Sequence, residues 1–252
     1  FWLKPFWLKR VGRVRRVAPP SPRPSASLGS LATAAMPIKL TYFGIEGVAE
    51  KVRLALVMTG TDFEDHRITF EEFGELKASL PMGMVPVMEV DGKTLTQSMA
   101  MLRWAGKTLG GGKLFPDDKY FEIEETIGLH EDLARAWMPP LYVGMRPAML
   151  GHEFANDDEK SAKIKAMRES FAKEGLPKFL GYYNTQLEKT GAFFCGPEVT
   201  IADLAILPQV RYFKKGVADF VDPTVVDQFP AVTAWCERMM AVPEIAKWYS
   251  SK

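Results

Sequence analysis

The sequence contains only two cysteines, Cys195 and Cys236, and only three histidines among 252 residues. The cysteines match no CxxC or zinc-knuckle spacing, and no pair of histidines has the spacing of metal ligands on one helix. We therefore expect no disulfide framework and no metal site, and the scarcity of cysteine favours a reducing compartment. No run approaches the roughly 18 unbroken apolar residues that span a bilayer, so no membrane partner is expected.

Acidic residues are missing from residues 1–35, which contain seven lysines and arginines. This segment is rich in Arg and Ser, a composition typical of organelle transit peptides. The chain starts with Phe1 rather than Met, so a translated upstream region or a cloning-derived segment fits equally well. We expect 1–35 to be a leader or a non-native extension and Met36 to begin the folded body. The protein is expected to be cytoplasmic, with import into an organelle if 1–35 is a transit peptide.

The rest of the chain is net acidic, because the formal charge of the whole sequence is only +1. Such a body would repel nucleic-acid phosphates, so no nucleic-acid partner is expected. A hydrophobic content of 47% is ordinary for a globular protein and excludes wholesale disorder.

Residues 36–109 alternate between strand-like and helix-like patterns. The expected elements are a strand over 38–43, a helix ending at Gly60, a strand over 63–68, a short helix over 70–80, a hairpin over 85–96 that turns at Asp91-Gly92, and a helix with Ser98 as its N-cap. The first helix joins two strands, which implies a parallel pair with a right-handed crossover. These residues are expected to form one small α/β domain.

After a linker over 110–117, only helical spacing remains. The expected helices are one from Ile123 to Leu141 that stops near Pro139-Pro140, one from Ile164 to Leu187 that bends at Gly175-Leu176-Pro177, a buried helix over 200–210, and two short helices over 231–240 and 244–249. Residues 118–252 are therefore expected to form an all-helical domain.

Thr200 and Asp203 have the spacing of a capping box at the start of the most apolar of these helices. Burial of an aspartate in such a helix is costly unless its oxygens accept hydrogen bonds there. We interpret Asp203 as a structural residue; a catalytic acid is the less favoured alternative.

Taken in order, these pieces resemble a cytosolic glutathione transferase, and most of all the sigma class, which includes the glutathione-dependent prostaglandin D synthases. The resemblance covers 36–252 and is carried by the stretches Lys39–Phe43, Phe63–Ile68, Glu89–Gly92, Thr94-Leu95 and Gln97-Ser98. It implies an α/β plus all-α fold, with a thioredoxin-like N-terminal domain followed by a helical C-terminal domain. It also implies a homodimer, glutathione as co-substrate and no metal.

Tyr42 lies at the end of the first strand, where open α/β sheets place their binding crevice. A thiol is mostly protonated at neutral pH, and only its thiolate is a good nucleophile. A phenol that donates a hydrogen bond to the sulfur favours the thiolate. The resemblance assigns this catalytic role to Tyr42. It implies that the glutathione thiolate attacks hydrophobic electrophiles, with peroxides and prostaglandin-type substrates as candidates. The alternative is a tyrosine packed in the core whose hydroxyl has a hydrogen-bond partner there.

The resemblance also implies a set of glutathione-binding residues. Val85 precedes the family's cis-proline, here Pro86, and its backbone would pair with the cysteinyl backbone of glutathione. Gln97 and Ser98 lie at a helix N-terminus, which attracts an anion such as the γ-glutamyl carboxylate. An ordinary strand start and a simple N-cap serine are the alternatives.

Two charged residues complete this implied set. Lys77 matches a lysine that meets the glycyl carboxylate, and Asp132 matches an acid that reaches across the dimer to the γ-glutamyl amine. A solvated lysine and a solvated acidic face shared with Glu125 and Glu131 are the alternatives.

Four positions depart from the family pattern. Glu46 and Val48 replace the two arginines of an Arg-Gly-Arg-Ala-Glu stretch, of which the second lies near the sulfur. Phe73 replaces a tryptophan, and Met84 replaces a lysine before Val85. An arginine near a thiol lowers the pKa of that thiol, so its absence weakens the expected thiolate formation.

Two other functions remain open at this point. The same fold serves as a non-catalytic lens crystallin or ligand carrier, and a thiol-disulfide enzyme would need a cysteine near Tyr42, where none occurs. For the transferase, Trp104, Trp137 and Met138 are expected among the residues lining the electrophile pocket.

Overall fold

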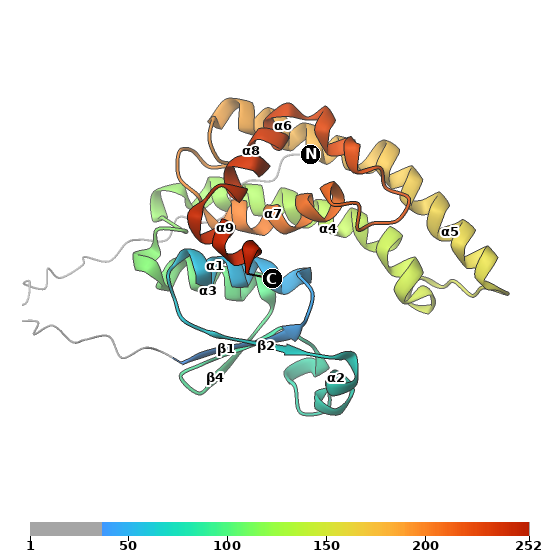
Figure 1. Cartoon of the computed structure of the whole chain (residues 1–252), viewed down its shortest axis with the longest axis horizontal. Helices are drawn as coiled ribbons and strands as arrows, with labels where there is room; N and C mark the ends of the chain where they lie inside the picture. The colour runs from blue at the N-terminus through green and yellow to red at the C-terminus, as the bar shows by residue number, and fades with distance from the viewer. Residues whose placement is uncertain (1–36, 252) are drawn as a thin grey trace, which may run out of the picture. The chain divides into compact units, whose positions relative to one another are not determined.

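The computed structural model describes residues 37–251, which include a four-stranded sheet (Figure 1). The strands are β1 (Ile38–Phe43), β2 (Glu64–Ile68), β3 (Val87–Val90) and β4 (Lys93–Thr96), in the spatial order β2-β1-β3-β4. β1 is parallel to β2, while β3 is antiparallel to both β1 and β4. The predicted parallel pair and hairpin are confirmed. The leader assigned to 1–35 and its Met36 boundary lie outside the described residues.

Three helices accompany the sheet: α1 (Glu50–Met58), α2 (Phe70–Leu76) and α3 (Ser98–Thr108). α1 and α3 pack against each other between the sheet and the helical part of the protein (Figure 1). Leu40 and Met88 from the sheet and Leu54 and Leu102 from the helices are fully buried in the shared core. This arrangement is the predicted thioredoxin-like domain.

The following residues are almost entirely helical, as predicted. The helices are α4 (Tyr120–Met145), α5 (Asp157–Ser170), a π turn over Phe171–Gly175, α6 (Leu176–Thr190), α7 (Ile201–Lys214), α8 (Pro230–Met240) and α9 (Pro243–Ser250). α7 is central: it packs against α1, α3, α4 and α8. Among residues 37–251, no helix is both long enough and apolar enough to cross a bilayer.

The prediction that a helix stops near Pro139-Pro140 is wrong, because α4 continues to Met145. The two prolines remove two helical N–H donors. However, Trp137, Pro140 and Val143 are buried on one face of α4, and Arg168 of α5 donates a hydrogen bond to the Pro140 carbonyl at 3.1 Å. Tertiary packing therefore maintains the helix through a sequence that locally disfavours it.

Two other helix boundaries differ from the prediction. The short helix ends at Leu76 rather than residue 80, and Pro81 soon begins a separate helical turn. Gln97, not Ser98, occupies the N-cap of α3, and neither contributes a side-chain capping hydrogen bond there. Ser98 is the first helical residue, so its hydroxyl is not used for N-capping.

Asp203 caps α7 as predicted and is completely buried. Its carboxylate accepts hydrogen bonds from the Thr200 N–H at 2.9 Å, the Phe194 N–H at 3.1 Å and the Trp235 indole N–H at 2.9 Å. Burial raises the pKa of Asp203, and these donors oppose that increase. The contacts support the structural interpretation of this residue.

Candidate functional site

The residues predicted to bind glutathione gather at one end of the sheet. Val87 pairs with Thr41 on one side and with Thr96 on the other. Because β3 is antiparallel to its neighbours, the end of β1, the start of β3 and the end of β4 coincide. Tyr42, the Val85–Pro86 peptide and Gln97 therefore lie at the same edge. The Val85–Pro86 bond is cis, as the resemblance implied.

Tyr42 projects beneath the loop that follows β1, with 8% of its surface exposed. Its hydroxyl oxygen accepts a hydrogen bond from the Val48 N–H at 3.4 Å, which leaves the hydroxyl proton for donation to another group. Burial raises the pKa of Tyr42; the Val48 N–H and the Arg53 charge lower it in part. The phenol is therefore protonated at neutral pH and competent as a hydrogen-bond donor.

Arg53 holds the loop that follows β1, and the sequence analysis did not single it out. Its fully buried guanidinium donates to the Ile45 carbonyl at 2.7 Å and the Phe43 carbonyl at 3.2 Å. It also pairs with Glu50 at 3.2 Å and Asp65 at 2.8 Å. An arginine among the apolar residues of the predicted helix was the signal that could have identified it.

Gly47 has no room for a side chain. It has φ +45°, and a Cβ atom there would lie 2.6 Å from the Tyr42 hydroxyl oxygen. We expect Gly47→Ala to displace the tyrosine or the loop and to lower the rate of glutathione conjugation at least about tenfold, because small displacements of reacting groups are costly. Steady-state kinetics with a chlorinated nitrobenzene measure this effect.

Gly44→Ala is the matched control in the same loop. A Cβ atom at Gly44 meets nothing within 4 Å, so this variant should retain the wild-type rate. Equal rates for the two variants would contradict the proposed contact between Gly47 and Tyr42.

The α2 segment places two more predicted residues beside this edge. β2 ends at Ile68, which pairs with Phe43 at the end of β1. Phe73 lies edge-on to Phe43, with ring centroids 5.4 Å apart. Lys77 follows α2 as its C-cap, and its stem passes over Gly83 just before β3. The Lys77 side chain therefore extends toward the residues just before β3, which include Val85.

Gln97 and Ser98 combine an unusual backbone with a helix start. Gln97 has φ +68°, a region that non-glycine residues rarely occupy and in which strained residues cluster at functional sites. The first N–H groups of a helix have no partner within the helix. The start of α3 therefore offers N–H donors and the half-buried Ser98 hydroxyl to an anion.

Met84 lies directly before Val85 at this edge, whereas Asp132 and Trp137 are not brought into this group. Asp132 is exposed on α4 and pairs with Arg135 of the same helix. The Met84 side chain is 51% exposed before β3. Trp137 is buried and packs edge-on against Phe213, with ring centroids 5.1 Å apart. It is therefore a core residue rather than an open pocket wall.

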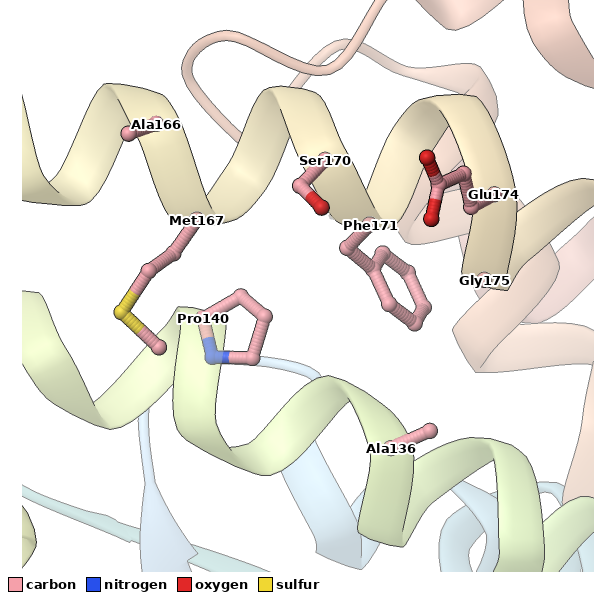
Figure 2. Close-up of a pocket in the computed structure, with 8 residues that line it drawn as sticks. All are labelled: Ala136, Pro140, Ala166, Met167, Ser170, Phe171, Glu174 and Gly175. Carbon is pink, nitrogen blue, oxygen red and sulfur yellow. The ribbon is translucent and has the colours of Figure 1, made fainter.

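Two cavities lie away from this edge. One of about 610 Å³ lies between α4 and α5 beside the π turn, and is lined by Pro140, Met167 and Phe171 among others (Figure 2). Another of about 840 Å³ lies near the end of α1 and includes Leu114 and Val199. Neither contains a residue predicted to bind glutathione. Within residues 37–251, no cluster of His, Cys, Asp and Glu could hold a metal ion.

Two family profiles match the chain. Residues 38–106 match the N-terminal domain of glutathione S-transferases, and residues 148–252 match their C-terminal domain. The chain is 29% identical over 218 residues to a protein described as probable glutathione S-transferase 8 of Caenorhabditis elegans, covering 85% of this chain and 96% of that protein.

Two solved structures are similar to the described fold. One is a monomeric glutathione S-transferase of the hookworm Necator americanus, with 29% identity, a TM-score of 0.66 and coverage of 86% of this chain and 97% of that one. The other is prostaglandin synthase D of Nilaparvata lugens, with a TM-score of 0.71 and coverage of 86% and 98%. Its identity of 22% supports a shared fold alone.

Proposed function

The chain belongs to the glutathione S-transferase family, and from this premise we propose that it is a sigma-like enzyme in which Tyr42 activates the thiol of bound glutathione. The observation that carries the proposal is the convergence of the Tyr42 hydroxyl, the Val85 backbone and the start of α3 at one edge of the sheet. The Tyr42 hydroxyl at this edge can contact the reacting sulfur, and the Val85 backbone and the start of α3 can bind the rest of glutathione.

Tyr42 assists the chemical step because its hydroxyl donates a hydrogen bond to the glutathione sulfur and keeps its proton. This bond stabilises the thiolate over the thiol and lowers the pKa of the bound thiol, so that the thiol proton is released to solvent. The thiolate lone pair then forms a bond to an electrophilic carbon, and the leaving group departs with the bonding electrons. Tyr42 is protonated before and after this step, because burial keeps its pKa high.

The tripeptide is held by backbone and helix-terminal groups. Val85 lies just before β3, and its N–H and C=O pair with the cysteinyl backbone in this proposal, as an added strand would. Gln97, Ser98 and the first N–H groups of α3 bind the γ-glutamyl carboxylate. Lys77 meets the glycyl carboxylate, beside Phe73 and Met84.

A homodimer completes the proposed site. Asp132 is exposed on α4, where it pairs with Arg135 of the same helix. In a dimer, Asp132 of a second copy binds the γ-glutamyl amine.

We also propose a division of the chain into a glutathione-binding domain over 36–109, a linker over 110–117 and a helical domain over 118–252. The proposed location is the cytoplasm, with import into an organelle as the alternative if 1–35 is a transit peptide.

The electrophile meets the sulfur beside the loop that follows β1. Ile45 and Val48 in this loop expose 55% and 47% of their surfaces. Two exposed apolar side chains in the loop whose Val48 N–H contacts the Tyr42 hydroxyl favour a hydrophobic substrate. Prostaglandin-type substrates and peroxides fall within this class.

Binding to immobilised glutathione tests the proposed site. We expect Ser98→Ala to raise the Kd for glutathione about tenfold, because a hydrogen bond to a charged group is lost. Ser161→Ala on the exposed surface of α5 is the matched control and should bind as the wild type does. Unchanged affinity in Ser98→Ala would contradict the assignment of the α3 N-terminus.

A further inference from the structure

Glu46 links the loop that follows β1 to the distant helix α7. Its carboxylate accepts a hydrogen bond from the Lys215 ammonium at 2.7 Å, and the Arg211 guanidinium lies 3.5 Å away. Glu46 is only two residues before Val48, whose N–H contacts the Tyr42 hydroxyl. The helical domain thus contacts the loop after β1, and the same loop contacts the hydroxyl of Tyr42.

The cationic partner on α7 is itself fixed in place. The Arg211 side chain is only 11% exposed. Its guanidinium lies 3.7 Å from the ring centroid of Tyr249 on α9 and donates to the Met240 sulfur at 2.8 Å. These contacts hold the Arg211 guanidinium in one position. The position of the guanidinium therefore determines where the Glu46 carboxylate lies.

The loop from 44 to 49 is therefore held from two sides. Arg53 binds its backbone from within, through the carbonyls of Ile45 and Glu46. Arg211 and Lys215 bind the Glu46 side chain from the helical domain. The Gly47–Val48 peptide, which presents the Val48 N–H to Tyr42, follows directly after these attachments.

We propose that Glu46 is a positioning residue for the conjugation reaction: its ion pairs with Arg211 and Lys215 hold the loop so that the Val48 N–H orients the Tyr42 hydroxyl toward the glutathione sulfur. This inference rests on the proposed function of Tyr42. At this position the glutathione transferase pattern has an arginine, whereas this sequence has Glu46. The ion pairs are thus a feature of this chain.

Glu46→Gln tests the proposal by removing the charge while retaining the size of the side chain. We expect kcat for conjugation to fall about threefold to tenfold, since a modest displacement of a catalytic group has an effect of this order. The KM for glutathione should change less than twofold, because the peptide binds through Val85 and α3. The ultraviolet absorbance of the bound thiolate should decrease at fixed pH.

Lys214→Gln is the matched control. It removes a neighbouring positive charge of α7 whose partner is Asp227, away from the loop, and it should leave kcat and the thiolate absorbance unchanged. The variant Lys215→Gln removes the exposed partner of the same carboxylate, and its loss of kcat should add less than fully to that of Glu46→Gln in the double variant, because both changes break one ion pair. Thermal unfolding should show that each variant is folded.

The outcomes distinguish this inference from the proposed function. A wild-type kcat and thiolate absorbance in Glu46→Gln, together with a large loss in Tyr42→Phe, would overturn the positioning role and retain the transferase mechanism. A Tyr42→Phe variant with the wild-type rate would overturn the mechanism itself. Effects of Glu46→Gln and Lys215→Gln on kcat that add fully in the double variant would also overturn the role of the ion pair.

Discussion

Replacing Tyr42 with phenylalanine is expected to lower kcat for glutathione conjugation about 100-fold, since removal of one donor to a developing anion has an effect of this order. The change deletes only the hydroxyl, and the ring stays packed beside Phe43, with centroids 5.3 Å apart. The Kd for glutathione should change little, because the sulfur is the only glutathione atom that the hydroxyl is proposed to contact. Steady-state kinetics and direct binding measure the two effects separately.

Tyr183→Phe is the matched control. Tyr183 is buried in the helical domain, and its hydroxyl has no hydrogen-bond partner among the described residues. Loss of that hydroxyl should therefore leave the rate unchanged. If Tyr42→Phe bound glutathione normally and retained the wild-type rate, the site would fit a ligand carrier better than an enzyme.

Asp203→Ala is expected to destabilise the protein by about 4 kcal/mol, because buried donors left without an acceptor cost about 1–3 kcal/mol each. The carboxylate accepts bonds from Thr200, Phe194 and Trp235, so its loss affects the start of α7, a loop and α8 together. Urea unfolding followed by circular dichroism measures the free energy of unfolding.

Asp203→Asn provides a graded comparison. Its amide retains one acceptor oxygen but turns an N–H₂ group toward a donor, so we expect a loss between those of the wild type and Asp203→Ala. The folded fraction of each variant should keep the wild-type turnover. A large loss of turnover without a loss of stability would instead favour a catalytic acid at Asp203.

Local patterns predicted much of the fold. The alternation over 38–43, the Asp91-Gly92 turn and the Thr200–Asp203 spacing each involve neighbouring residues, and each is confirmed. The cis bond before Pro86 is confirmed, because the family resemblance implied it. The catalytic role of Tyr42 stays a prediction, which was possible because Tyr42 lies at a strand end.

Contacts between distant residues escaped the sequence analysis. The path of α4 through Pro139 depends on tertiary packing that outweighs local propensity. The charges of Glu46 and Arg211 meet only because α7 packs against α1. Arg53 carries a structural role that its helical spacing alone did not reveal. The proposed role of Asp132 requires a second chain, which no pattern within one sequence can position.

Titration of the thiol in the binary complex with glutathione tests the central claim most directly. Ultraviolet absorbance of the thiolate, followed against pH, gives the pKa of the bound thiol. We predict a pKa well below the usual thiol value of about 8.5 for the wild type, and a return toward that value in Tyr42→Phe. Identical titration curves for the two proteins would show that the tyrosine hydroxyl does not stabilise the sulfur anion.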